Sequence, residues 1–153
     1  MKFKFSFQNV LKHRKILEDL AQRDFQEAQS RLYEEKNRLE KMKEEIYLAR
    51  ERAFAKTQEG GKTSPFLSQA YDFMSGQDIR IENQQIKIQE CEKIVEELRE
   101  ILRQKAIDYK IIEGLRDKKK EEFATEQRKL EQKKADDLNM MRFRPDNTGE
   151  KKR

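Results

Sequence analysis

The run GGKTS at residues 60–64 is the part of this chain most similar to a known chemical motif. It is similar to the end of a phosphate-binding loop, in which backbone amides and a lysine hold phosphate groups. The complete loop needs a glycine five residues before Gly61, and Lys56 stands there. It also needs a strand ahead of it, where this sequence has a helical pattern. The run therefore favours a plain turn over a nucleotide site.

The other reactive residue types stand alone. His13 is the single histidine, and no cluster of Asp, Glu or Cys surrounds it at ligand spacing. Cys91 is the single cysteine, which rules out an internal disulfide, and its place in an apolar helical repeat favours a small buried hydrophobe. The carboxylates alternate with lysines, whereas an active site needs a concave pocket. We expect no enzymatic activity, no metal ion and no cofactor.

Composition narrows the kind of structure that could position such residues. Charged residues make up 42% of the 153 residues and hydrophobic ones 35%, with no tryptophan. That is too few apolar residues for a compact core, so the chain is either disordered or a thin helical structure that buries one seam. The 35 basic and 30 acidic residues are interspersed, which is typical of a solvated helix surface. We expect no nucleic-acid partner.

Two further expectations follow from hydropathy. No apolar run approaches the ~20 residues that span a bilayer, so we expect no transmembrane segment. The start lacks the apolar region of a secretory signal, which favours a cytoplasmic protein. The lysines at 118–120 leave a basic nucleic-acid or membrane-surface binder as a minor alternative.

The periodicity of the apolar residues favours a helical structure over a disordered chain. Apolar residues recur at alternating steps of three and four over residues 21–53, which indicates a heptad seam. The seam positions are Ala21, Phe25, Ala28, Leu32, Glu35, Leu39, Met42, Ile46, Ala49 and Ala53. Upstream, Val10, Arg14 and Leu17 continue the seam through a four-four step, or stutter.

A second seam follows the glycine pair. Its positions are Ile81, Gln84, Ile88, Cys91, Val95, Leu98, Leu102, Lys105, Tyr109 and Ile112. Ser64-Pro65 is typical of a helix start, and Ser75 with Asp78 is a second candidate start. Either residues 65–74 form a separate short helix, or the second arm begins at 65 and bends near Gly76.

These patterns predict an all-α protein, a long antiparallel two-helix coiled coil in one domain over residues 1–141. We expect a first helix at about 6–57, a hinge at about 58–64, a second arm at about 65–140 and a disordered basic tail at 142–153. A break between the two seams centred near residue 66 would make facing residue numbers sum to about 132. Phe25 would then lie near Ile107, and Leu39 near Lys93 or Ile94. The free hairpin should be monomeric. The alternative is a parallel homodimer of extended chains.

The first residues alternate aromatic and polar side chains. With Ser6 as the helix N-cap, Phe5 and Val10 would pack as a hydrophobic staple. Phe3 would fold back onto the end of the second arm, and Phe7 would face the partner helix or a bound protein. At the hinge, Phe66, Tyr71 and Phe73 predict either an exposed partner contact or a local cluster that closes the hairpin.

Both ends of the chain carry a recognisable pattern. Its residues at the start are Phe3, Phe5, Gln8, Val10, Leu11, Arg14, Glu18 and Ala21. Those at the far end are Glu113, Leu115, Lys119, Phe123, Glu126, Gln127 and Leu130, followed by KKADDL. Over residues 3–138 this pattern resembles the flagellar type III export protein FliJ family.

The resemblance implies a non-enzymatic export adaptor and chaperone. Family members form an antiparallel coiled coil similar to the stalk subunit of rotary ATPases. They insert into the pore of the hexameric export ATPase, contact the cytoplasmic domain of the export-gate membrane protein and help other export chaperones. A protein of flagellar motility, cytoplasmic but peripheral to the inner-membrane export apparatus, is therefore expected. The alternatives are a dimeric structural scaffold and a stalk protein of a related injection-type system.

The resemblance also suggests two sets of partner-binding residues. Aromatic, basic and polar residues near the termini would meet the ATPase: Phe3, Phe7, Lys12, Arg14, Lys119 and Gln127. For the gate, Phe73 matches the family's aromatic at the start of the second arm. Gln77, Arg80 and Gln84 occupy the next positions of that patch and depart from its apolar pattern, and Phe66 and Tyr71 lie nearby.

Overall fold

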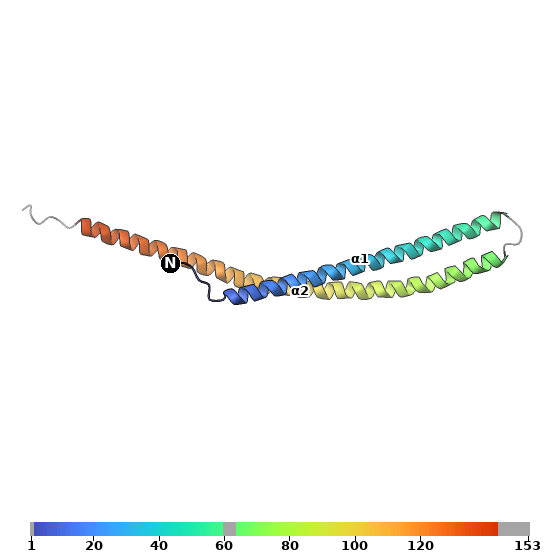
Figure 1. Ribbon diagram of the computed structural model, residues 1–153, viewed down its shortest axis with the longest axis horizontal. Coiled ribbons are helices and arrows are strands. Elements are labelled where there is room, and N and C mark those ends of the chain that lie inside the picture. The colour runs from blue at the N-terminus through green and yellow to red at the C-terminus, as the bar shows by residue number, and fades with distance from the viewer. Residues whose placement is uncertain (1, 60–63, 144–153) are drawn as a thin grey trace, which may run out of the picture. The chain divides into compact units, whose positions relative to one another are not determined.

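The computed structural model describes residues 2–59 and 64–143, and within these it contains two helices and no strand. Helix α1 spans Gln8–Glu59 and helix α2 spans Ser64–Arg142 (Figure 1). The helices pack against each other as an antiparallel hairpin, which confirms the predicted fold class. The alternative of two extended chains is wrong, because both helices of the pair belong to one chain.

Helix α1 begins one residue later than a Ser6 cap would place it. The Gln8 amide donates to the Phe5 carbonyl at 3.2 Å, and the Leu11 amide donates to the Phe7 carbonyl at 2.9 Å. Phe7 therefore occupies the cap position, so the predicted Ser6 cap is wrong. The staple is wrong as well, because Phe5 lies two residues before this cap and not directly before it. The Phe5 ring instead meets the Phe7 ring edge-on, with centroids 5.9 Å apart.

Helix α2 runs through Ser75 and Gly76 without interruption. The separate helix over residues 65–74 is therefore not formed. One glycine costs a helix only about 1 kcal/mol. The turns on either side of Gly76 are held by Met74, which is half-buried, and Gln77, which is buried. Packing of these turns outweighs the low helix propensity of a single residue.

The helix pair divides into two packed units. The central unit holds residues 16–106, and the terminal unit holds Met1–Lys15 with Ile107–Arg153. In the central unit, α1 and α2 run side by side in opposite directions (Figure 1). In the terminal unit, the first turns of α1 pack beside α2. The predicted single domain over 1–141 stays a prediction.

Burial follows the two predicted seams. In the central unit the buried apolar side chains are Ala21, Ala28, Ile46, Ala53, Ile88 and Val95. Half-buried seam residues of this unit are Phe25, Leu32, Glu35, Leu39, Met42, Ala49, Ile81, Cys91, Leu98, Leu102 and Lys105. In the terminal unit Tyr109 and Ile112 are half-buried and Leu11 is buried. Two helices can enclose only such a seam, so the described residues form no compact core.

The first turns of α1 continue the seam, but Val10 is not part of it. Leu11 and Ala21 are buried, and Arg14, Leu17 and Glu18 are half-buried, whereas Val10 is 38% exposed. The predicted seam positions Arg14 and Leu17 are therefore turned toward α2. The expectation assigned Val10 to the seam by spacing alone, four residues before Arg14. Leu11, three residues before Arg14, takes the inner position instead.

The register also differs from the expected one. Partner numbers sum to about 122 for Gln77 with Glu45 and for Lys87 with Glu35. Phe25 lies under the Arg99 guanidinium, at 5.7 Å from the ring centroid, so its predicted neighbour is wrong. The expectation placed the centre of the break near residue 66. Since α2 already begins at Ser64, the turn is centred earlier and facing pairs shift accordingly.

Some expectations concern residues that lie outside the described part of the chain. These are the core of the hinge at 60–63, which holds most of the GGKTS run, and the tail from 144 onward. Within the described part, neither helix contains an apolar stretch of the length that membrane crossing requires.

Candidate partner-binding surfaces

An apolar groove lies near the start of α2 in the central unit. Its volume is about 360 Å³, and its apolar wall consists of Leu48, Ala49, Phe66, Ala70 and Phe73. Polar side chains from both helices, Glu45, Arg52 and Gln69, complete the lining. We call this feature the hinge groove. Phe66, Phe73 and Leu48 remain exposed, so the groove presents apolar surface to solvent.

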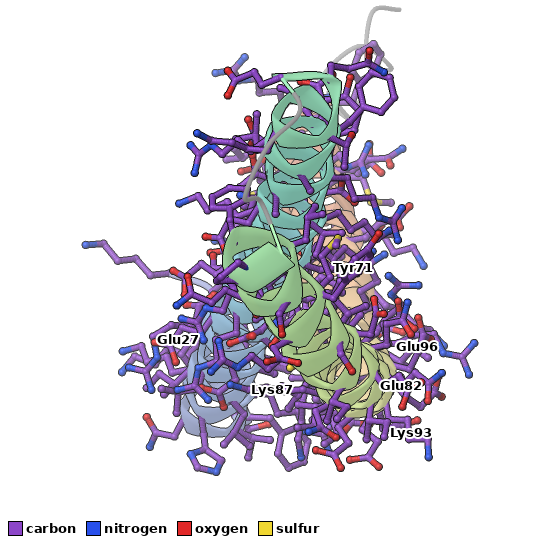
Figure 2. All side chains as sticks on the ribbon, turned by 90° about the vertical axis from the view of Figure 1, so that its right-hand side faces the viewer. Glu27, Tyr71, Glu82, Lys87, Lys93 and Glu96 are labelled. Carbon is purple, nitrogen blue, oxygen red and sulfur yellow. The ribbon has the colours of Figure 1, made fainter. Side chains whose placement is uncertain are left out.

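The structure brings only part of the predicted gate set together. Phe66 and Phe73 both line the hinge groove, and the Lys56 ammonium lies 5.7 Å from the Phe66 ring centroid. Tyr71 is exposed and does not line the groove; Figure 2 labels it on α2. The aromatic patch is thus one groove with a separate tyrosine beside it.

Two predicted gate residues face inward. Gln77 is 3% exposed and Gln84 is 6% exposed. The Gln77 amide nitrogen donates to the Glu45 carboxylate at 2.9 Å, and its amide oxygen accepts from Arg80 at 3.2 Å. The Gln84 amide nitrogen donates to both the backbone carbonyl and the carboxylate of Glu35. Both glutamines therefore join α2 to α1, and Arg80 alone of the three is exposed.

Glu35 is the acidic centre of this seam. Its side chain is 12% exposed and accepts from Gln84, with the Lys87 ammonium at 3.3 Å and the Arg38 guanidinium at 3.5 Å. The Gln84 hydrogen bond lowers the pKa of Glu35, and Lys87 and Arg38 add to this effect against the opposing effect of desolvation. The carboxylate is therefore the favoured form in the folded protein.

The α1 side of the hinge groove was missed by the sequence reasoning. Leu48 stands beside the seam residues Ile46 and Ala49, and it contributes to the groove wall. Tyr47 and Phe54 are further exposed aromatics of α1 that the seam does not use, seven residues apart on one face. A hydrogen bond to Glu51 raises the pKa of the Tyr47 phenol. Apolar residues off the seam were the signal that could have identified this surface.

The terminal unit uses several predicted ATPase-binding residues internally. The Arg14 guanidinium donates to the Asp108 backbone carbonyl at 2.7 Å. Phe3 folds back onto Phe123, with ring centroids 5.6 Å apart, as the sequence predicted. The Lys15 ammonium lies 5.1 Å from the Tyr109 ring centroid, and a hydrogen bond to Glu113 raises the pKa of the Tyr109 phenol. These contacts hold the start of α1 against α2.

The remaining residues of that set are available at the surface. Phe7 and Lys12 are exposed, and Gln127 is half-buried. Lys119 is exposed and pairs with Glu122 at 3.5 Å. Toward the end of α2, further apolar side chains are exposed: Leu130, Leu138, Met140 and Met141. The terminal unit therefore presents basic and apolar groups that its own packing does not use.

The structure assembles no chemical centre from the reactive residues. Within the described ranges 2–59 and 64–143, no group of three or more His, Cys, Asp or Glu is arranged to hold a metal ion. His13 is exposed, and Cys91 is a half-buried free thiol. The lysines near 118–120 share their face with Glu121, Glu122 and Glu126, so positive charge does not dominate there.

Comparison with known proteins identifies the family. No curated protein and no solved structure matches this chain. The family model described as Flagellar FliJ protein matches residues 3–148, which is nearly the whole chain and includes both helices. The chain therefore belongs to the flagellar FliJ protein family.

Proposed function

We propose that this chain is an adaptor of the flagellar type III export apparatus, which binds the hexameric export ATPase and couples it to the export gate. The family match over residues 3–148 carries this proposal, because the family has a flagellar export-related, non-catalytic role. The antiparallel helix pair adds physical support. Its width, about twice the diameter of one helix, suits a stalk within a ring.

The ATPase contact is assigned to the terminal unit. Phe7 and Lys12 are exposed there, whereas Arg14 and Phe3 are engaged by Asp108 and Phe123. Exposed lysines suit acidic loops of a ring pore, and they do so without one fixed docked geometry, because exposed ion pairs are weak individually. Lys119 and Gln127 belong to the same unit and complete the proposed surface.

The gate contact is assigned to the hinge groove. Its exposed rings, Phe66 and Phe73, supply the rigid apolar anchors that dominate many interfaces. Because Gln77 and Gln84 donate hydrogen bonds to α1, they are not part of the proposed surface. Leu48 from α1 takes their place beside the rings.

ATP hydrolysis by the cognate export ATPase is the decisive measurement. Adding this chain should stimulate hydrolysis in a saturable way, and Lys12→Glu should weaken the stimulation because it reverses an exposed charge of the terminal unit. Lys41→Glu, an exposed change in the central unit, is the matched control. Absence of both stimulation and a complex at every stoichiometry would overturn the proposal.

The gate contact needs a separate assay. Phe73→Ala should weaken binding to the purified cytoplasmic domain of the gate protein by roughly tenfold or more, the scale of an apolar hot spot. ATPase stimulation should be unchanged, and Tyr71→Ala should have a smaller effect because Tyr71 stands outside the groove. If Phe73→Ala removed both activities equally, its role would be in folding.

The same family match supports two further proposals. We assign the chain a chaperone role toward other export components, and a location at the cytoplasmic side of the export apparatus. Co-purification of the chain with the membrane fraction should depend on the gate protein. Retention in membranes that lack the gate would contradict this assignment.

A further inference from the structure

A second apolar line runs along the outside of α2 in the central unit. Ile79, Ile86, Ile94 and Ile101 are between 47% and 61% exposed. Asn83, Glu90 and Glu97 stand between them, so the seven positions follow steps of four, three, four, four, three and four. We call these seven residues the outer ladder.

The outer ladder is a distinct face of the helix. At 3.6 residues per turn, its members fall within an arc of about 80°, and that arc lies roughly 130° around α2 from the seam. Gln84, Ile88 and Val95 of the seam are buried, whereas every ladder residue is exposed. Figure 2 shows the nearby Glu82, Lys93 and Glu96 directed outward from α2, away from α1. The hairpin itself therefore does not cover this face.

The ladder spacing fits another helix. Steps of three and four place side chains on one stripe, which is how helices present knobs to a partner. Ile94 also opens onto a shallow groove of about 280 Å³ between the helices, where Ala28, Cys91 and Leu98 supply apolar wall. Asp24 and Glu27 of α1 border that groove, with Arg31 as its one basic lining residue. The surface is therefore apolar with acidic groups set into it.

The acidic groups inside the ladder form no ion pair with the described residues. Among residues 2–59 and 64–143, no ion pair involves Glu90 or Glu97, whereas the neighbouring Glu92, Glu96 and Glu100 each have a basic partner. A helix laid along the ladder would bring its own side chains against these two carboxylates. Lysine or arginine at those positions would neutralise them at the moment of docking.

The same charges disfavour a second copy of this chain. In an antiparallel pair that matches Ile79 with Ile101, Glu90 faces Glu90 of the other copy. In a parallel pair in register, Glu90 faces Glu90 of the other copy, and Glu97 faces Glu97. Like charges across a helix interface oppose association and select a different partner.

We propose that the outer ladder docks an amphipathic helix of another protein, one whose contact face alternates apolar residues with lysine or arginine. The four isoleucines provide the apolar contacts, and Glu90 and Glu97 set partner choice and register. This surface is separate from the hinge groove, because its residues occupy a different face of α2 and none of them lines that groove.

The test uses two synthetic helical peptides of about three heptads, each on an alanine and glutamine background. One places leucine and lysine alternately at the ladder spacing, and the other places leucine and glutamate. Fluorescence anisotropy with the full chain should show the leucine–lysine peptide binding at least about tenfold more tightly than its acidic counterpart, a difference of about 1.4 kcal/mol.

Charge reversal provides the sharpest control. The double variant Glu90→Lys with Glu97→Lys should reverse the preference between the two peptides. Glu34→Lys with Glu44→Lys changes net charge equally on exposed positions of α1 and should leave the preference intact. If both double variants lost affinity for the leucine–lysine peptide equally, net charge alone would explain binding and the proposal would be overturned.

The apolar half of the ladder is tested by Ile86→Ser with Ile94→Ser. Both residues are exposed, so the helix signal in circular dichroism should be unchanged while affinity for the leucine–lysine peptide falls roughly tenfold. Unchanged affinity would contradict the proposal that the outer ladder is the docking surface. Sedimentation should also be measured for the wild type and for this variant. If the wild type formed a dimer and the variant did not, a second copy would be the occupant of the ladder, and the proposed partner would be refuted.

Discussion

Individual polar residues set the alignment of the two helices. Gln77 and Gln84 stand seven residues apart on α2, and each bonds to a glutamate of α1. A slip of either helix would leave these amides and Glu35 without partners in a partly buried seam, which costs more than their pairing contributes. Apolar seam residues tolerate slippage far better, so we infer that the glutamine pairs define the register.

The lowered pKa of Glu35 predicts an acid-sensitive contribution to stability. Because the folded protein favours the carboxylate, this contribution is present above the ordinary pKa of 4.5 and is lost as pH falls through the folded-state value. Thermal unfolding followed by circular dichroism should therefore show a smaller difference between neutral and acid pH in Glu35→Gln than in wild type. Glu34→Gln, on an exposed neighbour, should keep the wild-type difference; a reduction there would contradict the assignment to Glu35.

At the scale of the element, the helices tolerate residues that disfavour them. Gly76 and Gly114 both lie inside α2, and a Cβ added at either would meet nothing within 4 Å. Neither residue is required by close packing within its own unit. Helix continuity comes from the seam residues around each glycine.

We therefore expect Gly114→Ala to stabilise the protein. Alanine gains about 1 kcal/mol of helix propensity over glycine, and the open space around Gly114 adds no steric cost. Urea unfolding monitored by helix signal should show a higher midpoint, and Ala124→Gly at another exposed position of α2 should show a lower one. A lower midpoint for Gly114→Ala would mean that another molecule or segment approaches that backbone.

At the scale of the whole molecule, the charge pattern predicts how the chain behaves in solution. The seams of α1 and α2 cover each other, and the exposed outer ladder carries Glu90 and Glu97, which oppose pairing with a second copy. The interspersed charges of the remaining surface favour solvation.

Light scattering should give the mass of a monomer, 18.5 kDa, across a wide concentration range. Salt screens the charges of the ladder. If the apolar ladder does not self-associate when its charges are screened, the mass should stay unchanged as salt is added. A dimer that persists on dilution would contradict both the monomer and the inferred role of the glutamates.

The sequence alone determined the helical class, the two seams and the family pattern, because period and residue type are local properties of the chain. The seams at Phe25, Ile46 and Val95 follow from spacing, and so does the break near the glycine pair. A local pattern cannot measure where two helices meet. A shift in the start of α2 moves every facing pair, and the position of α2 beside the first turns of α1 decides whether Val10 or Leu11 is covered.

Only the tertiary structure could decide which polar residues are internal. Spacing placed Gln84 and Arg14 on the seams, but it did not place Gln77 there. Spacing also could not name the partners of these residues, which are Glu45 for Gln77, Glu35 for Gln84 and the Asp108 carbonyl for Arg14, all far away in sequence. Apolar periodicity determined the elements, since an apolar stripe is a property of one helix. Pairing across the hairpin determined the surfaces, since a side chain becomes free or engaged only when the second helix is in place.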